Sequence, residues 1–163
     1  MMKKIIRIWV LLGVLFLVPC FSFSGVIDSK GDFYELVDDY WVYYAIRISG
    51  GSGSLIHVWP LGDDSEIYSP RVYLSPKDDI LVLYGQTSDY GWVLKKLNAV
   101  VAGEFEWSKI WQAEEMKVYF DKQGNVYVEG SQLQFGDWPC LYLGKLNRKT
   151  GKPIWEGCVD IRK

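Results

Sequence analysis

Residues 143–155 read LGKLNRKTGKPIW, and a related stretch, residues 94–107, precedes them in the chain. Each stretch begins with a strand-like segment that closes on Leu-Asn, and each finishes with Gly-x-x-x-Trp. The landmarks are Gly103 and Trp107 in the first stretch, and Gly151 and Trp155 in the second. Equivalent positions lie 48 or 49 residues apart, which indicates an internal repeat.

The repeat extends upstream of these stretches. Val72–Leu74 recurs as Val118–Phe120, 46 residues later. Each copy therefore contains an apolar triplet, a turn, two further strands and the Gly-x-x-x-Trp segment. A period in the mid-forties with about four strands per unit is typical of β-propeller blades. A degenerate earlier copy is expected within residues 33–68, where strands can be recognised but the glycine and tryptophan landmarks cannot.

Most of the chain reads as short β-strands. The expected strands are rich in β-branched and aromatic residues and are bounded by turn formers: Phe33–Val37, Trp41–Ile48, Leu55–Trp59, Ile80–Tyr84, Val126–Val128 and Leu141–Leu143. The only candidate for a helix, Trp107–Met116, lacks convincing helical spacing. We expect an all-β domain of antiparallel four-stranded blade-like repeats. About two to three units fit, too few for a complete propeller.

The N-terminus has the pattern of an export signal. Three basic residues precede the apolar run Ile8–Val18, and small residues follow it. The pattern predicts a signal peptide over residues 1–24, cleaved before Gly25. Two alternatives remain: a lipoprotein signal ending at Cys20, which would carry the lipid, or a retained anchor over Ile8–Ile27. Each places a single domain, residues 25–163, in the periplasm, on the cell surface or in the medium.

Charge and composition exclude several classes of protein. With 49% hydrophobic and 23% charged residues, the chain is not of the disordered type. Residues 25–92 hold 4 basic and 11 acidic side chains, a net charge of −7, whereas residues 93–163 have 11 and 9, a net charge of +2. This balance disfavours nucleic acid and anionic membrane surfaces. Membrane contact is therefore expected only through an N-terminal anchor.

Cysteine usage agrees with export. Cys140 and Cys158 flank a predicted hairpin turn whose midpoint is Lys149. A regular hairpin would place the two cysteines directly opposite each other, within disulfide range, and an oxidising compartment would allow the bond to form. A one-residue slip at a bulge would instead leave two buried thiols on opposite faces.

The segment TGKPIW, Thr150–Trp155, resembles the tryptophan-docking motif of quinoprotein-type (pyrroloquinoline-quinone-like) β-propeller repeats. The resemblance implies that the Thr150-Gly151 turn joins the last two strands of a blade and that the tryptophan packs against the neighbouring blade. The earlier copy keeps Gly103 and Trp107, so the resemblance covers roughly residues 70–163. It implies no cofactor here, because in that family the quinone and its metal occupy the axis of a complete propeller.

Other chemistry-bearing residues point to structure rather than catalysis. His57 is the only histidine and lies within a predicted strand. The paired carboxylates Asp38-Asp39, Asp63-Asp64 and Asp78-Asp79 lie near predicted turns, where aspartate is common. Such pairs bind calcium or act in acid–base chemistry when they are held across a cleft. We assign no catalytic or metal-binding residue.

Two functions follow from the sequence. The favoured one is an exported, non-catalytic binding or scaffold module without a cofactor, which binds another protein or associates with itself. The alternative is a secreted domain that binds carbohydrate or a small ligand through exposed aromatic residues. The candidates are Trp41, Trp59, Trp92 and Trp138, which lie outside the docking position near loops. The competing interpretation places these tryptophans in the core.

Overall fold

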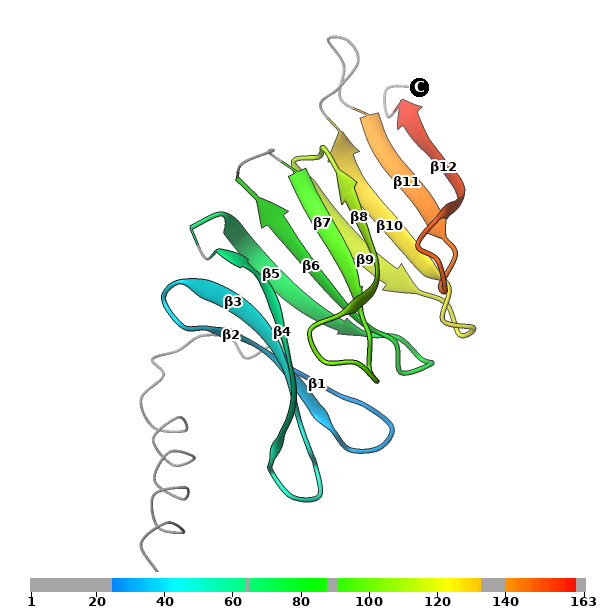
Figure 1. Ribbon diagram of the computed structural model, residues 1–163. Helices are drawn as coiled ribbons and strands as arrows, with labels where there is room; N and C mark the ends of the chain where they lie inside the picture. The colour runs from blue at the N-terminus through cyan, green and yellow to red at the C-terminus, as the bar shows by residue number, and fades with distance from the viewer. Residues whose placement is uncertain (1–24, 64, 88–90, 133–139, 161–163) are drawn as a thin grey trace, which may run out of the picture.

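The computed structural model describes residues 25–63, 65–87, 91–132 and 140–160, which form twelve β-strands in three sheets (Figure 1). The first sheet contains β1 (Val26–Ile27), β2 (Phe33–Asp38), β3 (Val42–Ile48) and β4 (Leu55–Asp63). The central sheet contains β5 (Ile67–Leu74), β6 (Ile80–Gln86), β7 (Gly91–Leu97) and β8 (Phe105–Trp111). The last sheet contains β9 (Glu115–Phe120), β10 (Val126–Gln132), β11 (Cys140–Leu146) and β12 (Pro153–Asp160).

Each sheet is an antiparallel meander of four strands that are consecutive in sequence. The expected all-β architecture of blade-like repeats is confirmed, and the three sheets do not close into a ring. The helix candidate Trp107–Met116 forms the end of β8 and the start of β9. Trp107 and Trp111 are buried while Ser108 and Ile110 between them are exposed, which is the two-residue period of a strand.

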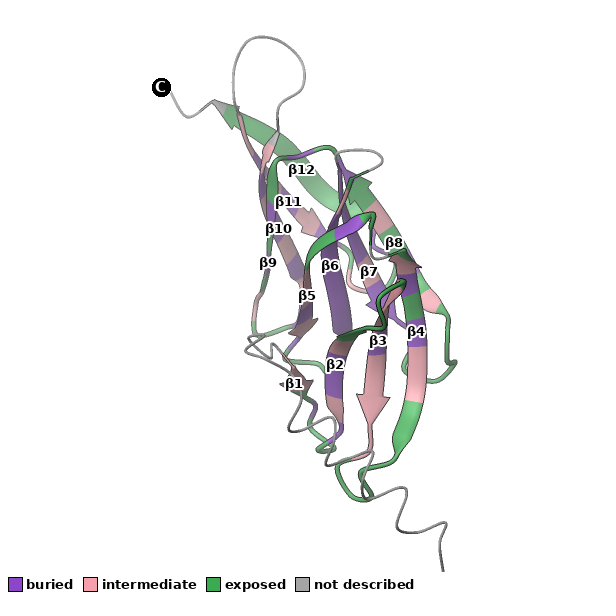
Figure 2. Cartoon of the chain, turned by 90° about the vertical axis from the view of Figure 1, so that its left-hand side faces the viewer, coloured by how far each residue is buried: buried purple, intermediate pink, exposed green. Residues whose placement is uncertain are grey.

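The central sheet is buried on both faces, so its strands are nearly continuous apolar runs (Figure 2). Val82 and Val93 pack in a cluster with side chains of the first sheet. Leu83 and Leu94 pack in a second cluster with side chains of the last sheet. We call the side of each sheet that points to the next sheet along the chain its forward face, and the opposite side its rear face.

The first sheet is a full copy of the repeat, although its sequence lacks the tryptophan that marks the other two copies. The turns before β4, β8 and β12 contain Gly53, Gly103 and Gly151, with φ angles of 64°, 78° and 66°. Four residues after Gly53 stands His57, and it pairs with Arg47 as Trp107 pairs with Lys96. The docking tryptophan of the other copies is therefore replaced by histidine in the first.

The first turn of each sheet repeats as well. Asp28, Ser75 and Asp121 begin these turns, and each side chain accepts hydrogen bonds from the backbone N–H groups two and four residues later. The fourth residue has a positive φ in all three turns: 84° at Gly31, 58° at Asp78 and 79° at Gly124. Asp tolerates this conformation better than most non-glycine residues. The three turns are thus equivalent in backbone geometry.

Cys140 and Cys158 form a disulfide between β11 and β12, with their Cα atoms 5.5 Å apart. The two cysteines are not directly opposed, because Cys158 pairs with Tyr142 in the strand register. The turn closes on Leu146 and Pro153, and a bulge follows between Lys145 and Leu146. Together these features displace the register by two residues, so the disulfide joins a diagonal pair on the same side of the sheet.

Removing the disulfide is expected to lower the free energy of unfolding by about 3 kcal/mol, the chain-entropy value for a loop of this length. The bond spans 18 residues of sequence at one end of the last sheet. The measurement is urea unfolding of the Cys140→Ala/Cys158→Ala variant beside the parent protein. Dithiothreitol should destabilise the parent protein and leave the variant unchanged. Equal sensitivity of the two proteins to the reductant would contradict the prediction.

Candidate docking interface

The tryptophan at the predicted docking position of the central sheet packs on the last sheet. The side chain of Trp107 is buried, with 8% of its surface exposed, and its Nε1 donates a hydrogen bond to the carbonyl oxygen of Arg148 at 3.1 Å. Its ring lies against Gly151 so closely that a Cβ atom there would come within 2.6 Å of Cδ2 of Trp107. Gly151 is thus required both by its positive φ and by this contact.

A buried charge cluster lies beside this tryptophan. The Nζ atom of Lys96 is 2.7 Å from Oδ1 of Asp79 and 2.8 Å from Oε2 of Glu106. Arg148, from the last sheet, places its Nε atom 2.6 Å from Oδ2 of Asp79. Lys96 also donates to the carbonyl oxygen of Arg148 at 3.5 Å. The cluster therefore joins the central and last sheets through paired charges, of which Lys96 and Asp79 are buried while Glu106 and Arg148 are partly exposed.

The first junction uses the same plan with other side chains. The Nη2 atom of Arg47 is 2.6 Å from Oδ2 of Asp32, and its Nη1 donates to the carbonyl oxygen of Ala99 at 3.1 Å. Ala99 precedes Arg148 by 49 residues, the distance that also separates Arg47 from Lys96. The hydrogen bond from the Arg47 guanidinium lowers the pKa of the Asp32 carboxyl. Both junctions thus bring a cation to a turn carbonyl of the next sheet.

A second set of polar contacts crosses between the central and last sheets. Trp111 donates from Nε1 to the hydroxyl oxygen of Tyr142 at 2.8 Å, and Tyr142 donates in turn to Glu156. Lys109 pairs with the same carboxylate at 2.7 Å. Hydrogen bonds from Lys109 and then Tyr142 lower the pKa of Glu156, whereas burial, followed by the bond to Glu156, raises the pKa of Tyr142. The network links the edge strands β8 and β12.

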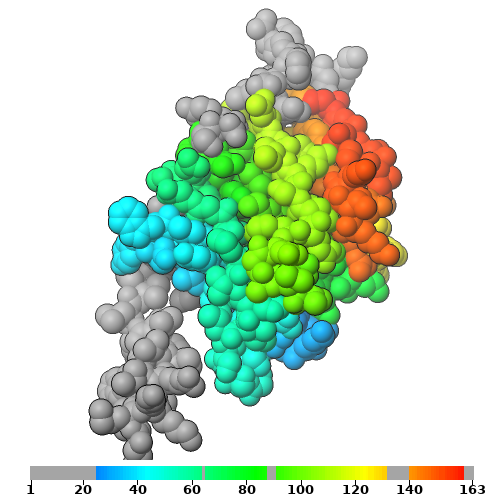
Figure 3. Space-filling view, in the orientation of Figure 1, coloured from blue at the N-terminus to red at the C-terminus, as the bar shows by residue number. Residues whose placement is uncertain are grey.

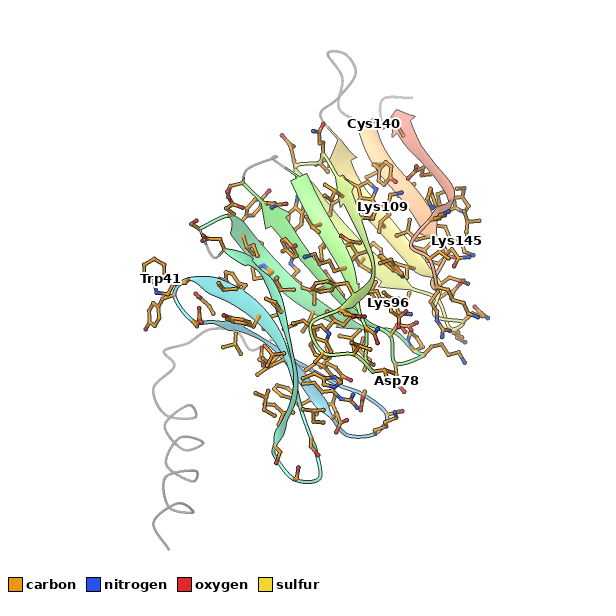
Figure 4. The ribbon with its side chains drawn as sticks, viewed as in Figure 1. Trp41, Asp78, Lys96, Lys109, Cys140 and Lys145 are labelled. Atoms are coloured by element: carbon orange, nitrogen blue, oxygen red, sulfur yellow. A yellow bond between two sulfur atoms is a disulfide. The ribbon has the colours of Figure 1, made fainter. Side chains whose placement is uncertain are left out.

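The last sheet carries the same docking groups on its forward face, where no further sheet follows among the described residues. Trp155 pairs with Lys145 in the strand register, as Trp107 does with Lys96. Trp155 is 49% exposed, in contrast to 8% for Trp107. The Nζ atom of Lys145 lies 5.1 Å from the centroid of the Tyr127 ring. The β11–β12 segment that bears these residues forms one edge of the molecule (Figure 3), and Figure 4 labels Lys145 on this segment and Lys96 on the central sheet.

We define the forward face of the last sheet by the residues that strand alternation places beside Trp155 and Lys145. They are Lys117, Tyr119, Tyr127, Glu129, Leu141, Leu143 and Val159. The face is partly apolar: Tyr119 is 47% exposed and Val159 is 49% exposed. A shallow pocket of about 130 Å³ lies at one end, lined by Glu115, Lys117, Glu129, Gly130, Ser131 and Leu141. Aromatic residues, here Tyr119, Tyr127 and Trp155, are enriched at protein interfaces relative to the rest of the surface.

Comparison with protein-family models, with curated proteins and with solved structures found no match to this chain.

The structure separates the four tryptophans considered as ligand contacts. Trp59 and Trp92 are buried in the two clusters between the sheets, with 0% and 3% of their surface exposed, so neither can form a surface platform. Trp41 is 77% exposed and lies beside Tyr40 at the tip of the β2–β3 hairpin, away from the docking interface (Figure 4). Trp138 and Cys20 lie outside the described residues, as does the predicted signal peptide.

The other candidate residues have structural partners. Asp39 accepts hydrogen bonds from two backbone N–H groups of its turn, and Asp78 accepts one from the backbone N–H of Ser29 at 3.1 Å. The His57 ring makes an edge contact with Trp59, with 5.3 Å between centroids. Within the described residues no cluster of histidine, cysteine or acidic side chains could hold a metal ion. The same part of the chain contains no helix that is long and apolar enough to cross a membrane.

The cations of the interface, Arg47 and Lys96, were not predicted from the sequence, nor was the pairing of Asp79 with Lys96. A signal was present, because Arg47, Lys96 and Lys145 are spaced by 49 residues. Asp78 and Gly124 are the fourth residues of equivalent turns. Asp79 is therefore equivalent to Asn125, which explains why the last sheet has no carboxylate at this position.

Proposed function

We propose that this protein is an exported, non-catalytic binding module that presents the forward face of its last sheet to a partner protein. The observation that carries the proposal is the pair Trp155 and Lys145. They stand at the positions that Trp107 and Lys96 use to bind a neighbouring sheet, yet Trp155 is half-exposed. A tryptophan that becomes buried on binding is a common centre of binding energy in protein interfaces.

Two observations support the export part of the proposal. The N-terminal sequence has the pattern of a signal peptide or lipoprotein signal. Cys140 and Cys158 lie at disulfide distance, and such bonds persist in oxidising compartments. The module would act in the periplasm, on the cell surface or in the medium. The contact of Trp107 with Gly151 also supports the proposal that the repeats belong to the quinoprotein-type propeller class.

Site-specific photo-crosslinking in cells tests the proposal. With p-benzoylphenylalanine in place of Trp155, ultraviolet light should give covalent adducts of this chain with protein. The matched control carries the same amino acid at position 100, because Val100 is 84% exposed in the β7–β8 turn but lies off the forward face. Adding Lys145→Glu to the first variant should reduce the adducts. If position 155 gives no protein adduct, or no more than position 100, the proposal is wrong.

A second candidate function rests on the exposed aromatic pair at the β2–β3 tip. Tyr40 is 86% exposed and Trp41 is 77% exposed, and aromatic side chains of this kind form platforms for sugar rings. We propose carbohydrate binding there as the alternative to protein binding. Titration of tryptophan fluorescence with a panel of glycans tests it, with Trp41→Ala as the control that should lose the response. No change with any glycan would eliminate the alternative.

A further inference from the structure

The two junctions between sheets define what a third junction would require. In the first, Arg47 donates to the carbonyl oxygen of Ala99, and in the second, Lys96 and Trp107 donate to the carbonyl oxygen of Arg148. Ala99 is the second residue of the turn before β8, and Arg148 is the second residue of the turn before β12. A further sheet that binds the forward face of the last sheet needs a turn of the same kind.

The first sheet provides such a turn at Ser49–Ser54. Its closing hydrogen bond, from Gly53 N–H to the carbonyl oxygen of Ser49, measures 2.8 Å, equal to that from Gly151 N–H to the carbonyl oxygen of Asn147. The φ angles of Gly53 and Gly151 are 64° and 66°. Gly151 is covered by Trp107, whereas a Cβ atom on Gly53 would meet nothing within 4 Å. The first sheet therefore has a glycine on which a docking tryptophan could pack, and no described residue covers that glycine.

The rear face of the first sheet is also suited to pack against the forward face of a last sheet. Alternation along the first sheet places Phe33, Glu35, Val37, Tyr44, Ile46 and Val58 on its rear face. Most of these residues are apolar, as are Val82 and Val128, which occupy the rear faces of the other two sheets and are buried there. Val37 remains 37% exposed. The rear face of the first sheet thus has the composition of a face that packs on a neighbour.

We propose that the partner of the forward face is a second copy of this chain, bound head to tail. Trp155 of each copy would pack on Gly53 of the other, and Lys145 and Trp155 would donate to the carbonyl oxygen of Gly50, the residue equivalent to Ala99 and Arg148. A two-fold axis makes both contacts at once and leaves no open face. Three sheets from each copy give six, which lies within the four to eight blades of closed propellers.

Charge favours this arrangement over contacts between like ends. Residues 25–92, which include the first sheet, have a net charge of −7, and residues 93–163, which include the last sheet, have a net charge of +2. Head-to-tail contact joins unlike halves, whereas contact between two first sheets joins two acidic surfaces, which repel each other. This inference rests on the proposed function and names the partner for the same face.

The first test is the mass of the full chain, expressed through a secretory route and measured by light scattering over a range of concentrations. We expect a dimer that dissociates on dilution. Trp155→Ala, Lys145→Glu and Gly53→Asn should each weaken dimerisation by about tenfold or more, because they alter the two central contacts. Asn tolerates positive φ and places a side chain where the Trp155 ring would lie. Val100→Ser is the matched surface control and should leave the dimer unchanged.

The second test identifies the contact. A mixture of isotopically light and heavy chains carrying p-benzoylphenylalanine at position 155 is irradiated and digested with trypsin. We expect crosslinks between copies to the peptide Ile48–Arg71, which contains the Ser49–Ser54 turn. A monomer at every concentration, a trimer or open array, or a dimer crosslinked from position 155 to position 155 would overturn the inference.

The outcomes separate this inference from the proposed function. A protein that stays monomeric but crosslinks in cells from position 155 to a different protein overturns the second-copy inference and retains the binding function. A protein that is monomeric and gives no adduct from position 155 overturns both. Unchanged circular dichroism spectra of the three interface variants would show that loss of the dimer is not loss of the fold.

Discussion

Trp107→Ala is expected to lower the free energy of unfolding by about 3–5 kcal/mol, the range measured for removal of a large buried aromatic side chain. The ring fills the space above Gly151 and is 8% exposed, so its removal leaves a cavity between the central and last sheets. The carbonyl oxygen of Arg148 also loses the hydrogen bond from Nε1. Urea unfolding followed by circular dichroism measures the loss.

Trp155→Ala is the matched control for this prediction. The residue has the same place in its repeat but is 49% exposed, and its ring contacts Tyr127 at a centroid distance of 6.5 Å. At a protein concentration low enough to prevent association, we expect a loss of about 1 kcal/mol or less. Equal losses for the two variants would show that the docking of Trp107 on Gly151 does not account for its contribution to stability.

Lys96→Met is expected to destabilise the protein by about 3 kcal/mol, because it removes one partner from a buried charge cluster. The side chains of Lys96 and Asp79 are only 7% and 10% exposed. Without the ammonium group, Asp79 keeps Arg148 as its cation, while Glu106 loses its partner in the cluster. Methionine retains most of the apolar stem, so the measured loss reports on the charge rather than on packing. Chemical denaturation measures it.

Two further variants test the cause of the stability loss in Lys96→Met. Lys145→Met changes the equivalent lysine of the last sheet, which lies over the Tyr127 ring, and should alter stability by about 0.5 kcal/mol or less. Asp79→Asn combined with Lys96→Met removes both charges of the buried Lys96–Asp79 pair and should recover part of the loss. The result would contradict the described cluster if the double variant lost more unfolding free energy than the two single variants do in sum.

The repeat could be predicted from the sequence because its landmarks have strict local requirements. Gly151 needs a positive φ and close approach of a ring, and Trp107 needs a large buried area, so both residue types recur at a fixed distance. Strands were predictable from their composition. Most of the expected strands were shorter than those observed, whereas Trp41–Ile48 was one residue longer than β3. The disulfide pair was also identified, but the direct opposition of its cysteines was not found, because a bulge after Lys145 cannot be read from the hairpin sequence.

The features that could not be predicted depend on contacts between sheets, which the local sequence does not encode. The first repeat was not recognised in full because His57 occupies the tryptophan position and Gly53 stands among other glycines and serines. One signal was available: Asp28 and Gly31 have the spacing of Asp121 and Gly124, which mark the same turn. The burial of Trp59 and Trp92 follows from which face of each strand meets a neighbouring sheet.

The order of the strands has a consequence for how the chain acquires its structure. Within each sheet every strand pairs with the strand just before or after it in sequence, so pairing within a sheet needs only short loops to close. A sheet can therefore assemble as soon as its own four strands have been synthesised. The disulfide lies within the last hairpin and also forms without waiting for distant parts of the chain. Assembly can thus proceed from the N-terminus, with each completed sheet serving as a template for the next.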